Sequence, residues 1–291
     1  EDRTYPSVSA GWLQDGSAAY LAAPTRPEHA ELVSSHLIDN QLCLSFGCTL
    51  IQTSCGCTIL VDTSLGDVEP PCPPEGRYRG LRELLKAAAG LAPEDIDVVV
   101  YSHAHTDHVA GGVRQDGRDG LVPAFPNARY LLRAAEHAAA VADAIPNDSS
   151  QMHARWFAPL ESAGVLEVLG GDEPYRLTEE VTLLPGYEGH TAGAWVVRVR
   201  SEGETAYYIG DALHHTLQFA HPAVCFEEYD WDERRAVDAR LRLLRTVSDE
   251  GALLLSPHLR FPGCGRVFRQ GSAFEFSAVD LEAKGEAAGR L

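Results

Sequence analysis

The chain has 291 residues, of which 45% are hydrophobic and 23% are charged, and its formal net charge is −18. This length and composition are those of an ordinary globular protein with enough material for a sizeable core. The acidic balance argues against nucleic acid as a partner or substrate, because the phosphate backbone is also negative. No stretch reaches the ~18 uninterrupted apolar residues that a membrane span needs, so no membrane partner is expected.

The seven cysteines are odd in number and irregular in spacing. Cys55 and Cys57 are one residue apart, which matches neither a redox CxxC nor a zinc-knuckle spacing. Cys43, Cys48 and Cys57 lie in apolar runs, so we expect mostly buried thiols, with a single disulfide as the alternative. Reduced thiols suit a cytoplasmic setting. The chain does not begin with methionine and has no signal peptide, so export after removal of such a peptide is the other possibility.

The hydrophobic pattern predicts strands and helices in alternation along the chain. A first strand is expected near Trp12. The further expected strands are 42–51, 58–62, 96–101, 129–132, 165–169, 180–184, 194–200, 205–210 and 252–255. The expected helices are 80–89, 133–143, 149–158 and 232–248. No linker-like composition divides the chain, so we expect one domain over residues 1–291, with a core at about 40–270 and extensions at both ends.

The predicted helix 232–248 combines an apolar face with several arginines, and Asp232 is its expected N-cap. The residues expected to form the buried face are Val237, Leu241, Leu244 and Val247. The arginines, which alternate with acidic residues, are Arg234, Arg235, Arg240, Arg242 and Arg245. Such a mixture of charges is typical of a solvated helix face, and we expect these arginines to lie there.

Three histidines and one aspartate fall within six residues, directly after the predicted buried strand 96–101. They are His103, His105, Asp107 and His108. Imidazole nitrogens and carboxylate oxygens are the usual ligands of hydrolytic zinc, and a catalytic site keeps one position open for water. A helix alone would not bring all four groups to one point, because residues two apart do not face each other. The pattern therefore predicts a metal site at a strand-to-loop junction, and a hydrolase.

Three more polar residues follow apolar strands. His190 lies in the glycine-bracketed turn 186–191, Asp211 ends the strand 205–210, and His258 follows the strand 252–255. Each would cost a few kcal/mol if it were buried without a partner, so each needs a hydrogen bond or a metal. Together with the cluster this makes five histidines and two aspartates, which suit two metal ions better than one. His214, close to Asp211, is a candidate for the pocket wall or for a hydrogen bond behind the ligands.

The pattern HxHxDH, followed by His190, Asp211 and His258, resembles the metallo-β-lactamase superfamily of dinuclear hydrolases over about residues 40–270. The resemblance implies an α/β fold, a four-layer αββα sandwich of two mixed sheets with helices on the outer faces. It places the site at one edge of the two sheets. It assigns His103, His105 and His190 to the first metal, Asp107, His108 and His258 to the second, and Asp211 to both.

Two positions indicate which members of that superfamily the chain resembles. True β-lactamases carry Cys or Ser where Asp211 stands, whereas an aspartate is typical of lactonase, glyoxalase II and phosphotriesterase-like members. Flavodiiron proteins carry Glu where His105 stands, so a redox di-iron centre is disfavoured. The segment 258–266, together with 210–214, resembles the methyl parathion hydrolase branch.

The expected reaction is cleavage of an ester-like bond by a metal-bridging hydroxide, which Asp107 orients before it passes a proton to the leaving group. The expected substrate is a small, fairly apolar aryl ester, organophosphate triester or lactone. We expect two divalent metal ions, Zn²⁺ before Mn, Fe or Co. Several aromatic residues could line an apolar pocket: Trp195, Phe219, Phe226, Tyr229, Trp231, Phe261 and Phe268.

Three alternatives stay open at this point. One is an N-acyl homoserine lactonase, and another is a mononuclear-iron persulfide dioxygenase, which shares HxHxDH but leaves the second metal position empty. The third is a metal-binding module without catalysis. The sequence also leaves open whether the chain forms a homodimer.

Overall fold

The computed structural model describes residues 18–21, 30–35, 42–66, 80–117, 120–145, 148, 151–226, 230–260 and 262–280. The strand expected near Trp12 lies outside these ranges. Within them, every helix is too short or too polar to cross a lipid bilayer.

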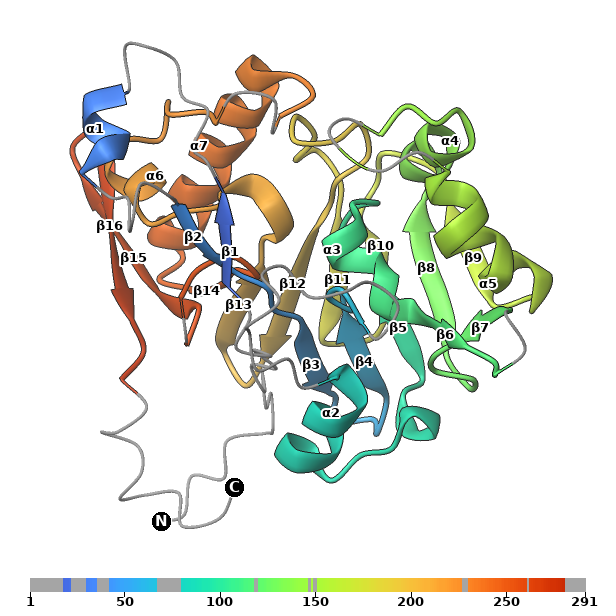
Figure 1. Cartoon of the computed structure of the whole chain (residues 1–291). Coiled ribbons are helices and arrows are strands. Elements are labelled where there is room, and N and C mark those ends of the chain that lie inside the picture. Colours follow the sequence, from blue (N-terminus) through green and yellow to red (C-terminus); the bar gives the residue numbers. More distant parts are fainter. Residues whose placement is uncertain are drawn as a thin grey trace, which may run out of the picture.

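Two mixed sheets form the centre of the molecule, and helices cover their outer faces (Figure 1). The five-stranded sheet has the order β3 (Thr49–Gln52), β4 (Thr58–Val61), β5 (Val98–Val100), β8 (Arg129–Arg133) and β9 (Leu166–Leu169). The β3–β4 pair is antiparallel and the other neighbours are parallel. The four-layer αββα architecture expected from the sequence is thereby confirmed.

The strands of the seven-stranded sheet lie side by side in chain order. Its strands are β10 (Tyr175–Arg176), β11 (Val181–Leu184), β12 (Val196–Ser201), β13 (Glu204–Tyr208), β14 (Leu253–Leu255), β15 (Cys264–Gln270) and β16 (Ala273–Ala278). Only β13 and β14 are parallel, because the long helix α7 (Glu233–Asp249) connects them. Two small sheets, β1 (Ala18–Leu21) with β2 (Leu42–Ser45) and β6 (Val113–Gln115) with β7 (Leu121–Pro123), complete the strands.

The remaining helices are short. They are α1 (Ala30–Ser34), α2 (Leu81–Ala89), α3 (Thr106–Val109), α4 (Ala134–Val141), α5 (Ala158–Ser162) and α6 (Leu217–Ala220). A π-helical turn, His153–Phe157, leads directly into α5. The helix expected at 149–158 is therefore displaced, since it continues to Ser162 and its first part is a π turn. Helix α2 ends as expected at Gly90, whose φ of 69° is one that glycine adopts without strain.

Strand alternation explains why three apolar cores separate the four layers. In the five-stranded sheet, Ile59 and Val61 face the other sheet, whereas Leu60 faces outward toward Leu85 of α2. In the seven-stranded sheet, Leu254 faces outward toward Leu244 of α7. All six side chains are buried, and full burial of one such side chain stabilises the fold by about 1.5–3 kcal/mol.

The expected strand 42–51 is wrong as a single element. It divides into β2, which pairs with β1, and β3, which pairs with β4. Between them the backbone N–H of Ser45 donates to the carbonyl of His258, so the chain leaves one sheet and enters the other at that point. A continuous apolar run does not reveal this change of pairing partner, because it depends on residues more than 200 positions away.

The expectation that all five arginines of α7 lie on a solvated face is wrong for Arg240, which is fully buried. Its position falls on the buried stripe of the helix with Ala236, Leu243 and Leu244. Its guanidinium donates to the backbone carbonyls of Ala212, Pro222 and Val224 at 2.7 to 2.8 Å, and it lies 3.7 Å from a carboxylate oxygen of Asp230.

We expect Arg240→Met to lower the free energy of unfolding by about 3–5 kcal/mol, because it removes the hydrogen bonds to three backbone carbonyls and the cation beside the buried carboxylate of Asp230. Urea unfolding of both proteins measures this difference. The control is Arg245→Met, an exposed arginine of the same helix, for which a change within about 0.5 kcal/mol is expected. Equal effects of the two substitutions would contradict the structural role of Arg240.

Candidate metal centre

The seven candidate ligands lie at one edge of the two sheets, where several strands end. His103, His105, Asp107 and His108 follow the carboxyl end of β5, and α3 begins within this segment. Asp211 follows β13 and His258 follows β14. Because β13 and β14 are parallel neighbours, their carboxyl ends lie side by side. His190 precedes β12, which pairs antiparallel with β13, and so reaches the same edge.

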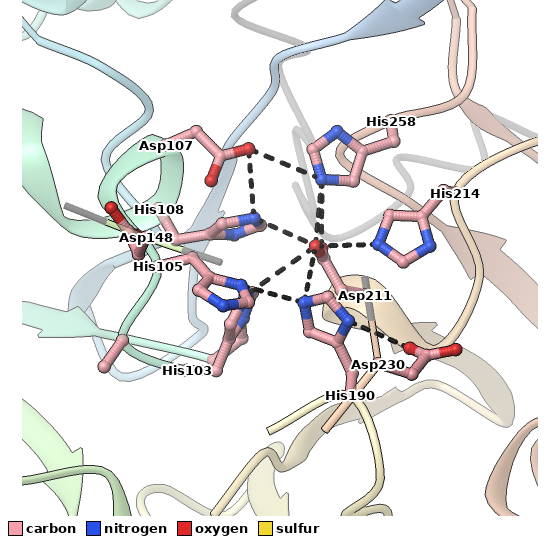
Figure 2. A network of polar contacts seen from close by, with 12 residues as sticks. His103, His105, Asp107, His108, Asp148, His190, Asp211, His214, Asp230 and His258 are labelled. Atoms are coloured by element: carbon pink, nitrogen blue, oxygen red, sulfur yellow. Dashed lines mark hydrogen bonds and ion pairs between the residues drawn. The ribbon is translucent and has the colours of Figure 1, made fainter. Parts of the chain in front are cut away.

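The structure brings all seven residues together around Asp211 (Figure 2). One carboxylate oxygen of Asp211 lies 3.1 Å from Nε2 of His258 and 3.2 Å from Nε2 of His108. The other lies 3.2 Å from Nε2 of His190 and 3.7 Å from Nε2 of His103. The carboxylate is therefore surrounded by imidazole nitrogens on several sides.

The ligand atoms fall into two groups that flank this carboxylate. In the first, Nδ1 of His105 lies 3.0 Å from Nε2 of His103 and 2.9 Å from Nε2 of His190. In the second, Oδ2 of Asp107 lies 3.6 Å from Nε2 of His108 and 3.7 Å from Nε2 of His258. Within each group all candidate ligand atoms are less than 4.8 Å apart, with Asp211 counted in the first.

The back of His103 is fixed by a chain of hydrogen bonds that starts at Asp62. The hydroxyl of Ser102 donates to Oδ2 of Asp62 at 2.7 Å, and its oxygen lies 3.0 Å from Nδ1 of His103. A hydroxyl has one hydrogen, and Ser102 donates it to the carboxylate of Asp62. Ser102 must therefore accept a hydrogen bond from Nδ1–H of His103. Nε2 of His103 then carries the lone pair, and it is this atom that faces the centre.

Three more imidazoles are oriented in the same way. Nδ1 of His108 donates to Asp62 at 2.8 Å, Nδ1 of His190 donates to Asp230 at 3.1 Å, and Nδ1 of His258 donates to the carbonyl of Ser45 at 2.8 Å. A carboxylate and a carbonyl only accept, so each of these rings carries its hydrogen on Nδ1. Such partners behind a histidine are what orients it toward a metal.

This arrangement fits divalent cations. In the neutral rings, whose single hydrogen lies on the outer side, the Nε2 lone pairs of His108, His190 and His258 point at the lone pairs of Asp211 across 3.1 to 3.2 Å. Acceptors that face each other at this distance need a positive charge between them. Within the described residues, Nε2 of His108 and Oδ1 of Asp211 are also buried without a hydrogen-bond partner. Histidine nitrogens with carboxylate oxygens are the ligand set of zinc.

The pKa values of the protein groups report the same need for positive charge. Burial opposes ionisation of Asp211, but His108 and His258 hold the pKa of its carboxyl well below the usual value. Burial disfavours a charged His190 as well, yet Asp211 and Asp230 raise the pKa of its imidazole to about 9. Burial, then the neighbouring His190, lowers the pKa of His105 to about 4. A cation would balance the carboxylates without protonated ligands.

His214, which the sequence left between two roles, lies directly at the centre. Its Nε2 is 3.2 Å from Oδ2 of Asp211, and its ring stacks on that of His258 at a centroid distance of 5.5 Å. Asp211, His214 and His258 form a further group with ligand atoms within 4.8 Å. Burial lowers the pKa of its imidazole. His214 therefore lines the site itself.

Several supporting residues were not anticipated. Asp62 follows β4 and accepts hydrogen bonds from Ser102, His108 and Tyr208. Its φ of 59° lies in the left-handed region, which aspartate tolerates better than most residues. An aspartate directly after the apolar strand 58–61 was the available signal for it. Asp230 follows no such apolar run in the sequence, and no neighbouring residue indicated that it would accept a hydrogen bond from His190.

The loop that carries His190 packs tightly against the start of α7. The backbone N–H of Trp231 donates to the carbonyl of His190, and that of Asp232 donates to Gly189. Gly189 has a φ of 145°, and a Cβ there would lie 2.2 Å from the backbone nitrogen of Ala236. Only glycine allows this close approach, which explains one glycine of the bracketed turn.

The aromatic residues expected around the pocket differ in their placement. Trp195 and Phe219 are buried in the apolar cores, whereas Trp231 and Phe268 are about half exposed. Phe226 meets the ring of His214 edge-on at 6.2 Å. Tyr229 and Phe261 lie outside the described residues. Among the described members of the set, Phe226 is the one whose ring contacts a residue of the centre.

Glu136 of α4 ties two ligand-bearing loops together. Its side chain is fully buried, and its carboxylate oxygens accept from the backbone N–H groups of Ala104 at 2.8 Å and Gly193 at 2.5 Å. Ala104 lies between His103 and His105, and Gly193 follows His190. Burial raises the pKa of Glu136.

We expect Glu136→Gln to weaken metal binding by about 10–100-fold, the usual effect of losing a partner behind the ligands. The amide oxygen can accept from only one of the two loops, and its NH₂ group would face the other N–H donor. Competition against a zinc chelator measures the affinity. Glu83→Gln, at an exposed position of α2, is the control, and the same affinity for both variants would contradict the role of Glu136.

Comparisons with known proteins found a family model and relatives that match parts of the chain. Residues 48–116, which include the HxHxDH segment, match the family model of the metallo-beta-lactamase superfamily. N-acyl homoserine lactonase AiiB of Agrobacterium fabrum is 30% identical over 141 residues, which make up 46% of this chain and 46% of that protein. The protein of the same name from Rhizobium rhizogenes is 29% identical over 217 residues, or 66% of this chain and 70% of that protein. The chain thus spans about half the length of the first relative.

Solved structures share the fold over nearly the whole chain. Hydrolase AbOPH of the beta lactamase superfamily has a TM-score of 0.74 at 22% identity, covering 94% of this chain and 99% of that one. AidC, a dizinc quorum-quenching lactonase in complex with a product, has a TM-score of 0.72 at 23% identity, covering 94% and 92%. The methyl parathion hydrolase branch stays a prediction. In sequence over residues 48–116, and in fold over the described structure, the chain resembles the metallo-beta-lactamase superfamily.

Proposed function

We propose that the protein is a metal-dependent hydrolase that opens the ester ring of a lactone, with N-acyl homoserine lactones as the first class to test. The observation that carries this proposal is the ring of imidazoles around Asp211, with four of the rings held from behind so that Nε2 faces the carboxylate. Both curated relatives are named as N-acyl homoserine lactonases, which supports the choice of substrate class.

The donor set suits two divalent cations, with zinc first. His103, His105 and His190 would hold one, Asp107, His108 and His258 the other, and Asp211 would contribute to both. Cations bound there would polarise the scissile carbonyl, stabilise the charge that develops on its oxygen, and lower the pKa of a water.

Asp107 is the residue best placed to move a proton. Its side chain is 25% exposed, whereas those of Asp211, His108 and His258 are at most 5% exposed. It therefore stands between the buried ligands and solvent. We assign to its carboxylate the uptake of a proton from the attacking water and the transfer of that proton to the alkoxide that leaves when the ester bond breaks. Ring opening then yields the hydroxy acid.

The surroundings of the centre suit a neutral, partly apolar substrate. Phe46 meets the ring of His258 edge-on at 5.9 Å, and Phe226 does the same with His214 at 6.2 Å. These two rings could contact an acyl chain or an aryl group. The net charge of −18 disfavours strongly anionic substrates. A lactone with an uncharged ring meets both conditions.

We expect the purified protein to contain two metal ions per chain and to hydrolyse acyl homoserine lactones, with activity lost on chelation and restored by Zn²⁺. The measurement is elemental analysis followed by a panel of acyl lactones, p-nitrophenyl esters and methyl parathion. Faster turnover of a p-nitrophenyl ester or of methyl parathion would replace lactones by that compound class as the proposed substrate. One iron per chain with oxygen uptake would indicate a persulfide dioxygenase instead, and full activity of metal-free protein would refute the proposal.

We expect Asp211→Ala to remove metal from both groups, because this carboxylate lies between them. The fall in kcat/KM should exceed the ~10–100-fold that loss of an outer hydrogen-bond partner costs. Metal content and lactone turnover of the variant measure this. Asp238→Ala, at an exposed position of α7, is the matched control. An unchanged content of two metals in the Asp211 variant would refute its shared role.

A further inference from the structure

A second cluster of metal-type ligands lies in the outer helical layer, on elements separate from the seven-residue centre. His137 belongs to α4, His153 begins the π-helical turn, and Glu161 belongs to α5. One carboxylate oxygen of Glu161 lies 2.7 Å from Nε2 of His137, and the other lies 3.0 Å from Nε2 of His153. We call these three residues the outer triad.

The three ligand atoms of the outer triad lie within 4.8 Å of one another. Zinc binds imidazole nitrogen and carboxylate oxygen at about 2.0–2.2 Å, so two ligands at a tetrahedral angle are about 3.3–3.6 Å apart. The contacts of 2.7 and 3.0 Å need to open by about 0.3 to 0.9 Å to reach that separation. Partly exposed side chains can make such a change by small rotations.

The environment allows a metal to enter and to keep a water ligand. The side chains of His137, His153 and Glu161 are 22%, 29% and 38% exposed. Two histidines with one carboxylate leave the fourth tetrahedral position to solvent. The set is chemically that of Zn²⁺, and its imidazoles equally suit Ni²⁺ or Cu²⁺.

The backbone at His153 is a second, independent observation. A π-helix is rare, and when it occurs it is often found at a functional site. Here it occupies His153–Phe157 and passes directly into α5, which carries Glu161. The π turn sets the position of His153 relative to Glu161, eight residues later, so that both of their polar groups meet His137 of α4.

We propose that His137, His153 and Glu161 form an additional site for a divalent transition metal, with zinc as the first candidate. The bound ion links α4 to the π turn and α5 on the surface of the fold. The residues directly before the two histidines reach inward: Glu136 accepts from Ala104, and the sulfur of Met152 lies 3.3 Å from the hydroxyl oxygen of Thr106. The ion therefore ties together two elements that contact the 103–108 segment from behind.

The test compares zinc content after dialysis of the zinc-loaded, full-length protein against buffer with micromolar free Zn²⁺. Wild type should hold one more zinc per chain than His153→Ala or Glu161→Gln. The glutamine variant keeps the shape and one acceptor oxygen, so its loss of zinc does not require loss of folding. His221→Ala, which removes an exposed histidine of α6's end, is the control and should hold as much zinc as wild type.

Thermal unfolding gives a second readout. Added Zn²⁺ should raise the melting temperature of wild type and of His221→Ala by more than that of Glu161→Gln, in which only the seven-residue centre can bind it, because a ligand that binds only the folded state stabilises it. Equal zinc content of wild type, His153→Ala and Glu161→Gln would overturn the proposal.

This result is separate from the test of the proposed function. In an Asp211→Ala background, the difference of one zinc between the intact triad and Glu161→Gln should persist. If the seven-residue centre failed to bind metal while this difference remained, the proposed function would be refuted and the outer site would be supported.

Discussion

The geometry of the metal centre depends on the hydrogen bonds that four imidazoles make through Nδ1, on the side away from Asp211. Four groups each accept a hydrogen bond from the Nδ1–H of one ring. They are Asp62, Asp230, the hydroxyl of Ser102 and the carbonyl of Ser45. In the neutral rings, the opposite nitrogens then face Asp211 with their lone pairs. Without positive charge between them, this arrangement would be repulsive, so the hydrogen bonds behind the rings define a cation site before any cation binds.

These supporting groups come from all parts of the chain, and the fold explains how they meet. Asp62 follows β4, Asp211 follows β13, and His258 follows β14, while Ser45 lies at the end of β2. Parallel neighbours place successive strand ends at one edge, and the two sheets face each other across a common apolar core. Helices α4 and α7 add Glu136 and Arg240, two buried charges whose hydrogen bonds go to the loops of this edge.

The site residues that could be predicted from the sequence are those that follow apolar strands. His103, Asp211 and His258 each stand directly after such a strand, and the cost of burying them without a partner marks them as functional. Glu136 and Arg240 carried no comparable signal. Both lie on helices where charged residues are normally solvated, and Arg240 differs from its four neighbours only in the direction it faces on α7. Its burial follows from where α7 docks, which no local pattern encodes.

The sequence by itself determined the ligand types, their order along the chain and the alternating strands that fill three apolar cores, because periodicity and residue chemistry are local properties. Only the tertiary structure decided which tautomer each imidazole adopts, since that depends on partners such as Asp62, 46 residues from His108, and Ser45, 213 residues from His258. It also decided that the apolar run 42–51 divides between two sheets, and that His137, His153 and Glu161 meet. Contacts between distant segments follow from packing, and packing is a property of the whole chain.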